Sequence, residues 1–166
     1  MYSVKILAID PGYERLGIAI IEREPRQKES LSYSDCFKTS AKLPFPERLL
    51  SIGEEIERLI KKFQPEAMIL EKLFFKNNAK TAMHVAEVRG ALIYLAMSRG
   101  IPLFEYTPLQ IKMAIAGYGA GDKQQVIDMV ELLIPIKKAI RHDDEYDAIA
   151  CGLTHFACVR NPLKQG

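Results

Sequence analysis

The stretch VKILAIDPG, residues 4–12, decides the fold of this chain. Its apolar run from Val4 to Ile9 has the length and the β-branched content of a buried strand. The run ends at an acid, Asp10, which a Pro-Gly turn follows, and a second apolar run, LGIAII at residues 16–21, begins shortly after the turn. The two runs predict a hairpin of buried strands with an acidic residue at the end of the first.

The rest of the chain continues as alternating strands and helices. Residues 31–39 have a looser strand pattern, the apolar residues from Pro46 to Phe63 fall at helical spacing, and the buried run 67–71 ends in a second acid. The further expected elements are a helix over about 80–99, a strand over 103–106, a helix from Pro108, a mobile glycine-rich loop over 117–123, a helix over 124–133 and a last helix that begins near Asp143 or Asp144 and continues through Phe156. This order predicts an α/β domain with a mixed five-stranded sheet flanked by helices.

Size and composition favour one domain, residues 1–160, with a tail at 161–166. The chain has 166 residues, 48% of them hydrophobic, and a formal net charge of +2, so any nucleic-acid contact must come from local basic patches. Its three cysteines form no CxxC pair, which predicts reduced, mostly buried thiols. No apolar run approaches the roughly 18 residues of a membrane span, and no signal-peptide pattern opens the chain, so we expect a soluble, cytoplasmic protein without membrane contact.

Four acids are candidates for one site. Asp10 and Glu71 each end a buried strand, where α/β proteins build their sites, and Asp144 and Asp147 share one face at the start of a helix. Clustered carboxylates repel one another unless cations neutralise them, and their hard oxygen atoms suit Mg²⁺ or Mn²⁺. Two such ions about 3.5–4 Å apart can activate a water and stabilise the leaving oxygen of a phosphodiester.

Each acid alone also has an ordinary structural interpretation. An Asp-Pro-Gly sequence is usually only a turn, and the pair Asp144 and Asp147 could be a helix cap and a solvated helix face. Glu71 is stronger, because an acid that ends a buried run must be paired or desolvated. The expected convergence of the four acids is what favours a site. Three further basic residues, Lys137, Lys138 and Arg141, are interpreted as a solvated turn.

Three stretches then resemble a known family. ILAIDPG at 6–12, ILEKLFFKNNAKTA at 69–82 and DEYDAIACGLTH at 144–155 are similar to the three acidic motifs of the RuvC family of Holliday-junction resolvases. EVRGA at 87–91 and FEYTPLQIK at 104–112 fill the intervals as they do in that family. The resemblance runs in order over nearly the whole chain.

The resemblance implies a ribonuclease H-like fold and a homodimer that resolves four-way DNA junctions by paired, Mg²⁺-dependent nicks, in cooperation with a branch-migration motor. By motif position, the catalytic and metal-binding residues would be Asp10, Glu71, Asp144 and Asp147, with two Mg²⁺ ions per active site that Mn²⁺ can replace. Lys112 and Lys123 would contact DNA phosphate, and Phe74 would stack on a base at the crossover. Elementary chemistry agrees, since lysine neutralises phosphate and an aromatic ring can hold an unstacked base.

In the third motif, three consecutive residues are candidates for the first ligand, namely His142, Asp143 and Asp144. Some members of the family carry histidine at this position. Helical spacing from Asp147 favours Asp144. Three other functions are weighed against the resolvase. A YqgF-type nuclease that acts on RNA or unbranched substrates would share the acids, an actin-like ATPase needs about twice this length, and a non-catalytic junction-binding module would not need four acids.

Overall fold

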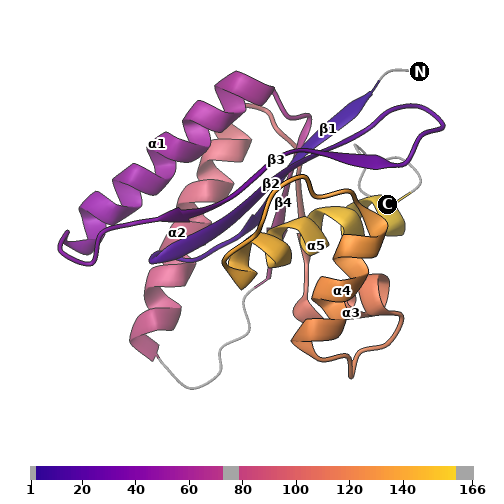
Figure 1. Ribbon diagram of the computed structural model, residues 1–166. Coiled ribbons are helices and arrows are strands. Elements are labelled where there is room, and N and C mark those ends of the chain that lie inside the picture. Colours follow the sequence, from indigo (N-terminus) through magenta and orange to yellow (C-terminus); the bar gives the residue numbers. More distant parts are fainter. Residues whose placement is uncertain (1–2, 73–78, 160–166) are drawn as a thin grey trace.

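A computed structural model describes residues 3–72 and 79–159 of the chain (Figure 1). The strands form one sheet and are β1 (Val4–Asp10), β2 (Arg15–Arg23), β3 (Glu29–Lys38), β4 (Ala67–Glu71) and β5 (Leu103–Tyr106). The helices are α1 (Phe45–Phe63), α2 (Ala79–Ser98), α3 (Pro108–Ala116), α4 (Lys123–Leu133) and α5 (Asp143–Cys158). The predicted α/β class and the predicted number of strands are confirmed.

The sheet is mixed, as predicted, in the order β3-β2-β1-β4-β5. The first three strands pair antiparallel, whereas β4 lies parallel to both β1 and β5. Ile9 is the Cα partner of Leu70, so the two strands end side by side at Asp10 and Glu71. The parallel pairing therefore brings the two strand-ending acids to the same edge of the sheet.

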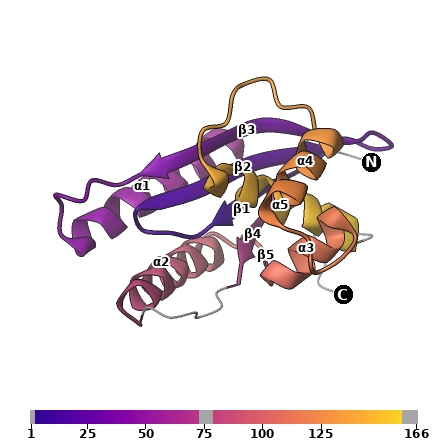
Figure 2. The same ribbon diagram turned by 60° about the horizontal axis from the view of Figure 1, so that its bottom comes forward.

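Helices cover both faces of the sheet (Figures 1 and 2). Alternate residues of β1 serve the two layers: Leu7 and Ile9 pack in the core with α1 and α2, while Ile6 and Ala8 pack in the core with α3, α4 and α5. Because β1 is buried on both faces, its sequence is a nearly continuous apolar run rather than an alternating one.

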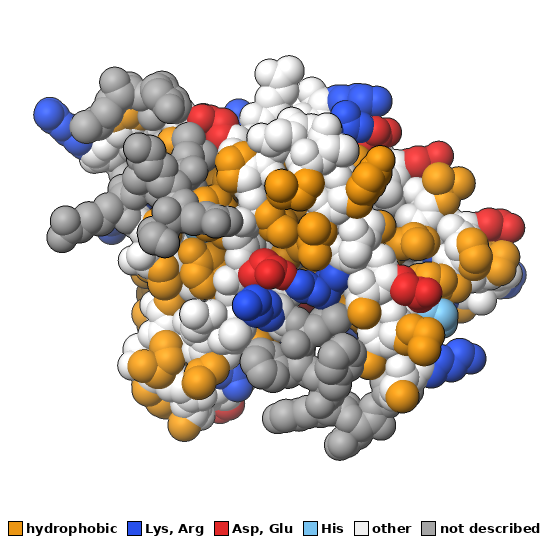
Figure 3. Space-filling model, turned by 180° about the vertical axis from the view of Figure 1, so that it is seen from behind, with side chains coloured by type: hydrophobic (Ala, Val, Ile, Leu, Met, Phe, Trp, Pro, Cys, Tyr) orange, Lys and Arg blue, Asp and Glu red, His pale blue; other side chains and the backbone are white. Residues whose placement is uncertain are grey.

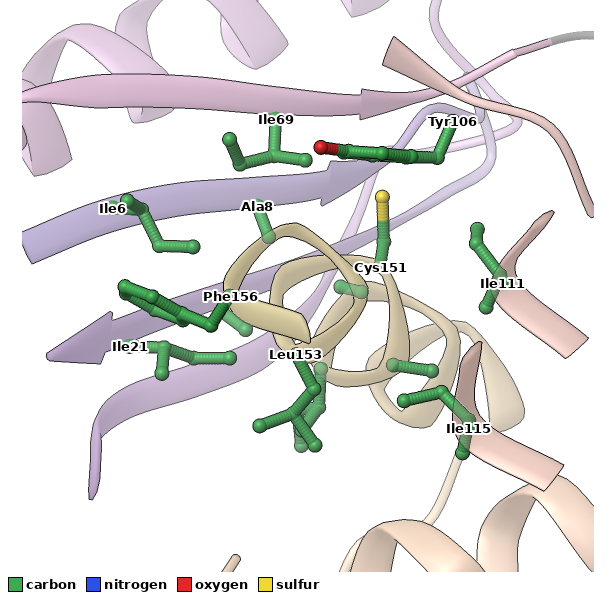
Figure 4. Packing of buried hydrophobic residues seen from close by; sticks show 14 of the residues in the cluster. Ile6, Ala8, Ile21, Ile69, Tyr106, Ile111, Ile115, Cys151, Leu153 and Phe156 are labelled. Atoms are coloured by element: carbon green, nitrogen blue, oxygen red, sulfur yellow. The ribbon is translucent and has the colours of Figure 1, made fainter. Parts of the chain in front are cut away.

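Helix α5 packs directly on β1 and β2, and small residues permit this approach (Figure 4). A Cβ atom on Gly152 would stand 2.7 Å from Ile21 Cδ1 and 3.0 Å from Ala8 Cβ. Every residue from Ala148 to Phe156 is buried. This tight contact fixes the start of α5, and with it the third acidic motif, relative to the sheet.

Helix α4 begins one residue earlier than its apolar pattern indicates. Asp122 caps the helix by accepting a hydrogen bond from the Gln125 backbone, and the Gln125 side-chain oxygen accepts one from the Asp122 backbone. Lys123, expected in the preceding loop, is therefore the first residue of α4. A matching capping box between Thr107 and Gln110 begins α3.

The segment between α4 and α5 is anchored to the protein by Lys138. Its Nζ lies 2.6 Å from Glu145 Oε1 and donates to the Ser34 backbone oxygen at 2.6 Å. The Ser34 hydroxyl also donates to Glu145 Oε1, and this glutamate side chain is only 6% exposed. The Lys138 side chain is 48% exposed, as a solvated turn requires, but it has a further role that was not predicted, because it neutralises a buried carboxylate.

The described ranges contain no helix that is long and apolar enough to cross a membrane. The three cysteines are free; Cys36 and Cys151 are buried and Cys158 is exposed, as the expectation of reduced, mostly buried thiols requires.

Candidate functional site

The close packing of α5 on β2 brings the four predicted acids to one edge of the sheet. A Cβ atom on Gly17 would stand 1.8 Å from the Asp144 carbonyl oxygen and 3.2 Å from Asp10 Cβ. The backbone of α5 at Asp144 therefore lies against the hairpin that β1 and β2 form. Asp147 lies one turn further along the same helix, so α5 supplies two acids to the edge where Asp10 and Glu71 end their strands.

The carboxylates interact electrostatically. Burial raises the pKa of Asp10 well above its usual value, and the negative charges of Glu71, Asp147 and Asp144 raise it further. Burial also raises the pKa of Glu71, although a hydrogen bond with Asp10 works in the opposite direction. The hydrogen bond between the two carboxyl groups therefore acts on them in opposite directions, raising the pKa of Asp10 and lowering that of Glu71.

Two basic side chains neutralise the acids on α5. Lys123 Nζ lies 2.9 Å from Asp147 Oδ2 and 3.4 Å from Asp143 Oδ2, and Arg15 Nε lies 3.2 Å from Asp144 Oδ2. Partial burial is the largest single effect and opposes the charged form of Lys123, but the hydrogen bonds and charges of Asp147 and Asp143 together outweigh it and raise the lysine pKa. Burial keeps the pKa of Asp147 raised despite this partner.

The donor set suits a divalent cation by its chemistry. Four carboxylates form an acidic cluster of the hard oxygen ligands that Mg²⁺ and Mn²⁺ prefer. Within residues 3–72 and 79–159, no group of three His, Cys, Asp or Glu side chains is already arranged to hold one ion. Asp144 and Asp147 form ion pairs with Arg15 and Lys123 instead.

A pocket of about 200 Å³ adjoins the acids between α3 and α4. Glu71 and Asp147 lie on its wall together with the two lysines that the sequence predicted to contact phosphate, Lys112 and Lys123. Apolar side chains complete the lining, namely Pro108, Ile111 and Val126. The predicted lysines and acids therefore share one concave surface.

The three consecutive candidates for the first ligand of the third motif are placed differently. His142 precedes α5, and Asp143 is an exposed first residue of the helix, whose carboxylate contacts Lys123. The charge of Asp144 raises the pKa of the neighbouring Asp10. The geometry thus favours Asp144. The predicted stacking residue, Phe74, lies outside the described residues.

Sequence reasoning did not single out Arg15, whose partner Asp144 is 129 positions away along the chain. No local pattern in the sequence signals this pair. The histidines have structural contacts: His84 stacks on Phe45 with ring centroids 3.9 Å apart, and the buried His155 Nδ1 lies 3.0 Å from the Tyr106 hydroxyl.

Comparisons with known proteins agree over almost the whole chain. The family profile described as crossover junction endodeoxyribonuclease RuvC matches residues 6–155. A curated relative of that name from Desulfitobacterium hafniense is 43% identical over 150 residues, which cover 90% of each chain. A solved structure, Thermus thermophilus RuvC in complex with a Holliday junction substrate, superposes with a TM-score of 0.85 at 33% identity and covers 92% of this chain and 93% of that one. The yeast mitochondrial resolvase Ydc2 shares the fold alone, with a TM-score of 0.67 at 14% identity.

The mixed sheet, its helices and the acids at its edge define a nuclease of the ribonuclease H-like class. Within that class, the chain belongs to the RuvC family of crossover junction endodeoxyribonucleases.

Proposed function

We propose that this chain is a divalent-metal-dependent endonuclease that resolves four-way DNA junctions by paired nicks. One observation carries the proposal beyond family membership: Asp10, Glu71 and Asp147 come from three distant segments, and the charges of Glu71 and Asp147 raise the pKa of Asp10 while that of Asp147 also raises the pKa of Glu71. Partly buried carboxylates that repel one another are typical of sites where a cation neutralises them.

The acids Asp10, Glu71, Asp144 and Asp147 would hold Mg²⁺, which Mn²⁺ can replace, with two ions per site. When bound, the metal supplies activation of the attacking water and stabilisation of the leaving oxygen. The chain's own groups do the rest. Asp10 and Glu71 would bind the cation through their carboxylate oxygens, and Asp147 would exchange its ion pair with Lys123 for contact with the cation.

Lys112 and Lys123 would bind the phosphates of the cleaved strand. Both line the pocket beside Glu71 and Asp147, so a phosphodiester that reaches the acids passes within their range. Lys123 has two carboxylate partners in the free protein, and the phosphate would replace them as its counter-charge. Phe74 keeps its expected stacking role from the family resemblance.

A homodimer would present two such sites to the two-fold symmetry of the junction. Helix α2 carries an exposed apolar stripe, in which the exposed fractions are 63% for Met83, 75% for Tyr94 and 62% for Met97. Ala86 and Gly90 lie between them on the exposed side of the helix. This helix is on the far side of Figure 1, and the reverse view in Figure 3 shows hydrophobic side chains gathered on that face around a few charged ones. Exposed patches of this kind mark subunit contacts.

The direct test is a nicking assay on a four-way junction, a linear duplex of the same sequence and an RNA strand, with Mg²⁺, with Mn²⁺ and with chelator. We expect paired cuts in opposing strands of the junction alone, lost with chelator and in Asp10→Asn. Equal cleavage of duplex or RNA would contradict junction resolution and favour the YqgF-type activity.

A further inference from the structure

Arg89 connects three elements at the edge of the sheet that carries the acids. The side chain projects from α2 and is only 13% exposed. Its Nη1 donates to the backbone oxygen of Glu71 at 2.5 Å, and its Nη2 donates to Glu105 Oε1 on β5. One guanidinium therefore joins α2 to the last residue of β4 and to the neighbouring strand.

Arg89 contacts the Glu71 backbone at the point where the regular strand pairing of β4 ends. Glu71 is the last residue of the strand, and beyond it the Lys72 amide still bonds to the Tyr106 carbonyl at 2.8 Å before the described chain ends. On the other side, β1 ends at Asp10 and turns away. The orientation of the Glu71 side chain follows from the backbone at this strand end, and Arg89 fixes that backbone from the α2 side.

We propose that Arg89 is a positioning residue, which holds Glu71 in the orientation that binds the divalent cation. The inference rests on the proposed function, because it needs Glu71 to be a ligand. Residues that hold metal ligands in place typically change metal affinity about 10–100-fold when they are replaced. Arginine suits this role because its planar group can donate to two acceptors in fixed directions.

The competing explanation is purely structural: Arg89 could stabilise the fold through its ion pair with Glu105 alone. The two roles separate by substitution. Glu105→Gln removes the negative charge but keeps an acceptor and leaves the contact with the Glu71 oxygen in place. Arg89→Met keeps the aliphatic stem and removes both contacts, while Arg89→Lys keeps one donor and the charge.

The experiment measures Mn²⁺ binding to the DNA-free protein by the electron paramagnetic resonance signal of free Mn²⁺, at a temperature well below every variant's thermal midpoint. The Mn²⁺ concentration for half-maximal junction nicking and the junction Kd are measured in parallel. We expect Arg89→Met to weaken Mn²⁺ binding about tenfold and to raise the half-saturating concentration equally, with an unchanged junction Kd. Arg89→Lys should recover part of the affinity, and Glu105→Gln should stay within about twofold of the parent.

Two results would overturn the positioning role: parent-like Mn²⁺ affinity in Arg89→Met, or an equal loss in Glu105→Gln, which would assign the effect to the ion pair. Glu71→Gln in the same titration separates this failure from that of the proposed function. If Glu71→Gln binds Mn²⁺ like the parent, Glu71 is not a ligand and the metal site itself is misassigned. If Glu71→Gln loses Mn²⁺ and Arg89→Met does not, only the positioning role fails.

Discussion

Gly17 on β2 lies directly beside the Asp144 backbone on α5, so close that an added Cβ atom would stand 1.8 Å from the Asp144 carbonyl oxygen. This contact sets the distance between the third acidic motif and the hairpin that carries Asp10. The obstructing atom is backbone rather than the end of a flexible side chain, so any substitution must move the helix.

Gly17→Ala should therefore displace the start of α5 and separate Asp144 from Asp10. We expect a loss of about 1–3 kcal/mol in stability, which is typical of overpacking, and a nicking rate reduced more than tenfold. Urea unfolding and the junction assay measure the two effects. Gly53→Ala in α1 is the matched control, since its added Cβ meets nothing within 4 Å. It should gain about 0.5–1 kcal/mol and nick like the parent.

Asp144→Asn should harm cleavage far more than Asp143→Asn. Asp144 acts on Asp10 and on Asp147, whereas Asp143 is exposed, pairs with Lys123 and acts on Asp147 less than Asp144 does. We expect at least a hundredfold lower nicking rate for Asp144→Asn, less than a threefold change for Asp143→Asn, and unaltered junction affinity for both in gel shifts. His142→Ala is the control. If Asp143→Asn shows the larger loss, the ligand is Asp143; a large loss in His142→Ala would assign a histidine to the site.

The raised pKa of Asp10 makes a prediction about stability and pH. Burial and the neighbouring acids raise the folded-state pKa above the ordinary value of 3.8, so the stabilising protonated form predominates below 3.8. As the pH rises from 3.8 through the raised folded-state pKa of Asp10, the metal-free protein loses this contribution to its stability. Asp10→Asn cannot ionise at this position. Its thermal midpoint at pH 8 should therefore exceed that of the parent by about 2–4 °C for each kcal/mol of repulsion that the substitution removes. The difference should disappear near pH 4.

Addition of Mn²⁺ at pH 8 provides the companion measurement. The parent midpoint should rise, because a cation bound by the folded state removes the repulsion, and Asp10→Asn should respond weakly. A midpoint of Asp10→Asn at or below the parent value at pH 8 would show that the repulsion within the cluster does not reach Asp10.

The sequence predicted the sheet and the acids because both depend on short-range patterns. β1 and β4 are apolar runs buried on both faces, and an acid that ends such a run, such as Glu71, is conspicuous. The start of the last helix was predicted within one residue, because acids at its first turn suit the helix dipole.

The partners of the acids could not be predicted, because they come from remote segments. Arg15 and Asp144 meet only through the packing of α5 on β2, and Lys138 reaches Glu145 only through the path of the segment before α5. In a single sequence, a lysine that neutralises a buried carboxylate has the same local pattern as a lysine in solvent. The start of α4, by contrast, has a local signal in the sequence. Asp122 and Gln125 have the spacing of a capping box, which places Lys123 inside the helix.

Lys112→Ala and Lys123→Ala should each weaken junction binding regardless of sequence and reduce the slope of log Kd against log salt by about one. Both lysines line the pocket beside the acids. Each phosphate contact that is lost leaves about one more counterion bound to the DNA. Fluorescence anisotropy over a salt series measures the slope. Lys28→Ala is the matched control, because Lys28 is exposed in the turn between β2 and β3, away from the strand ends that carry Asp10 and Glu71. An unchanged slope in either pocket variant removes that lysine from the phosphate contacts.

The last prediction concerns assembly, because one active site per chain cannot cut two opposing strands at once. If the α2 stripe joins two copies, Tyr94→Glu should place a charge in the contact and leave a monomer in sedimentation, with its thermal unfolding still cooperative. Parent subunits mixed with excess Asp10→Asn should form heterodimers that nick one strand, so paired cuts fall with the square of the parent fraction. The same mixture made with Tyr94→Glu in both chains should show no such dependence. If one monomer binds each junction and paired cuts stay proportional to parent protein, the dimeric mechanism is wrong.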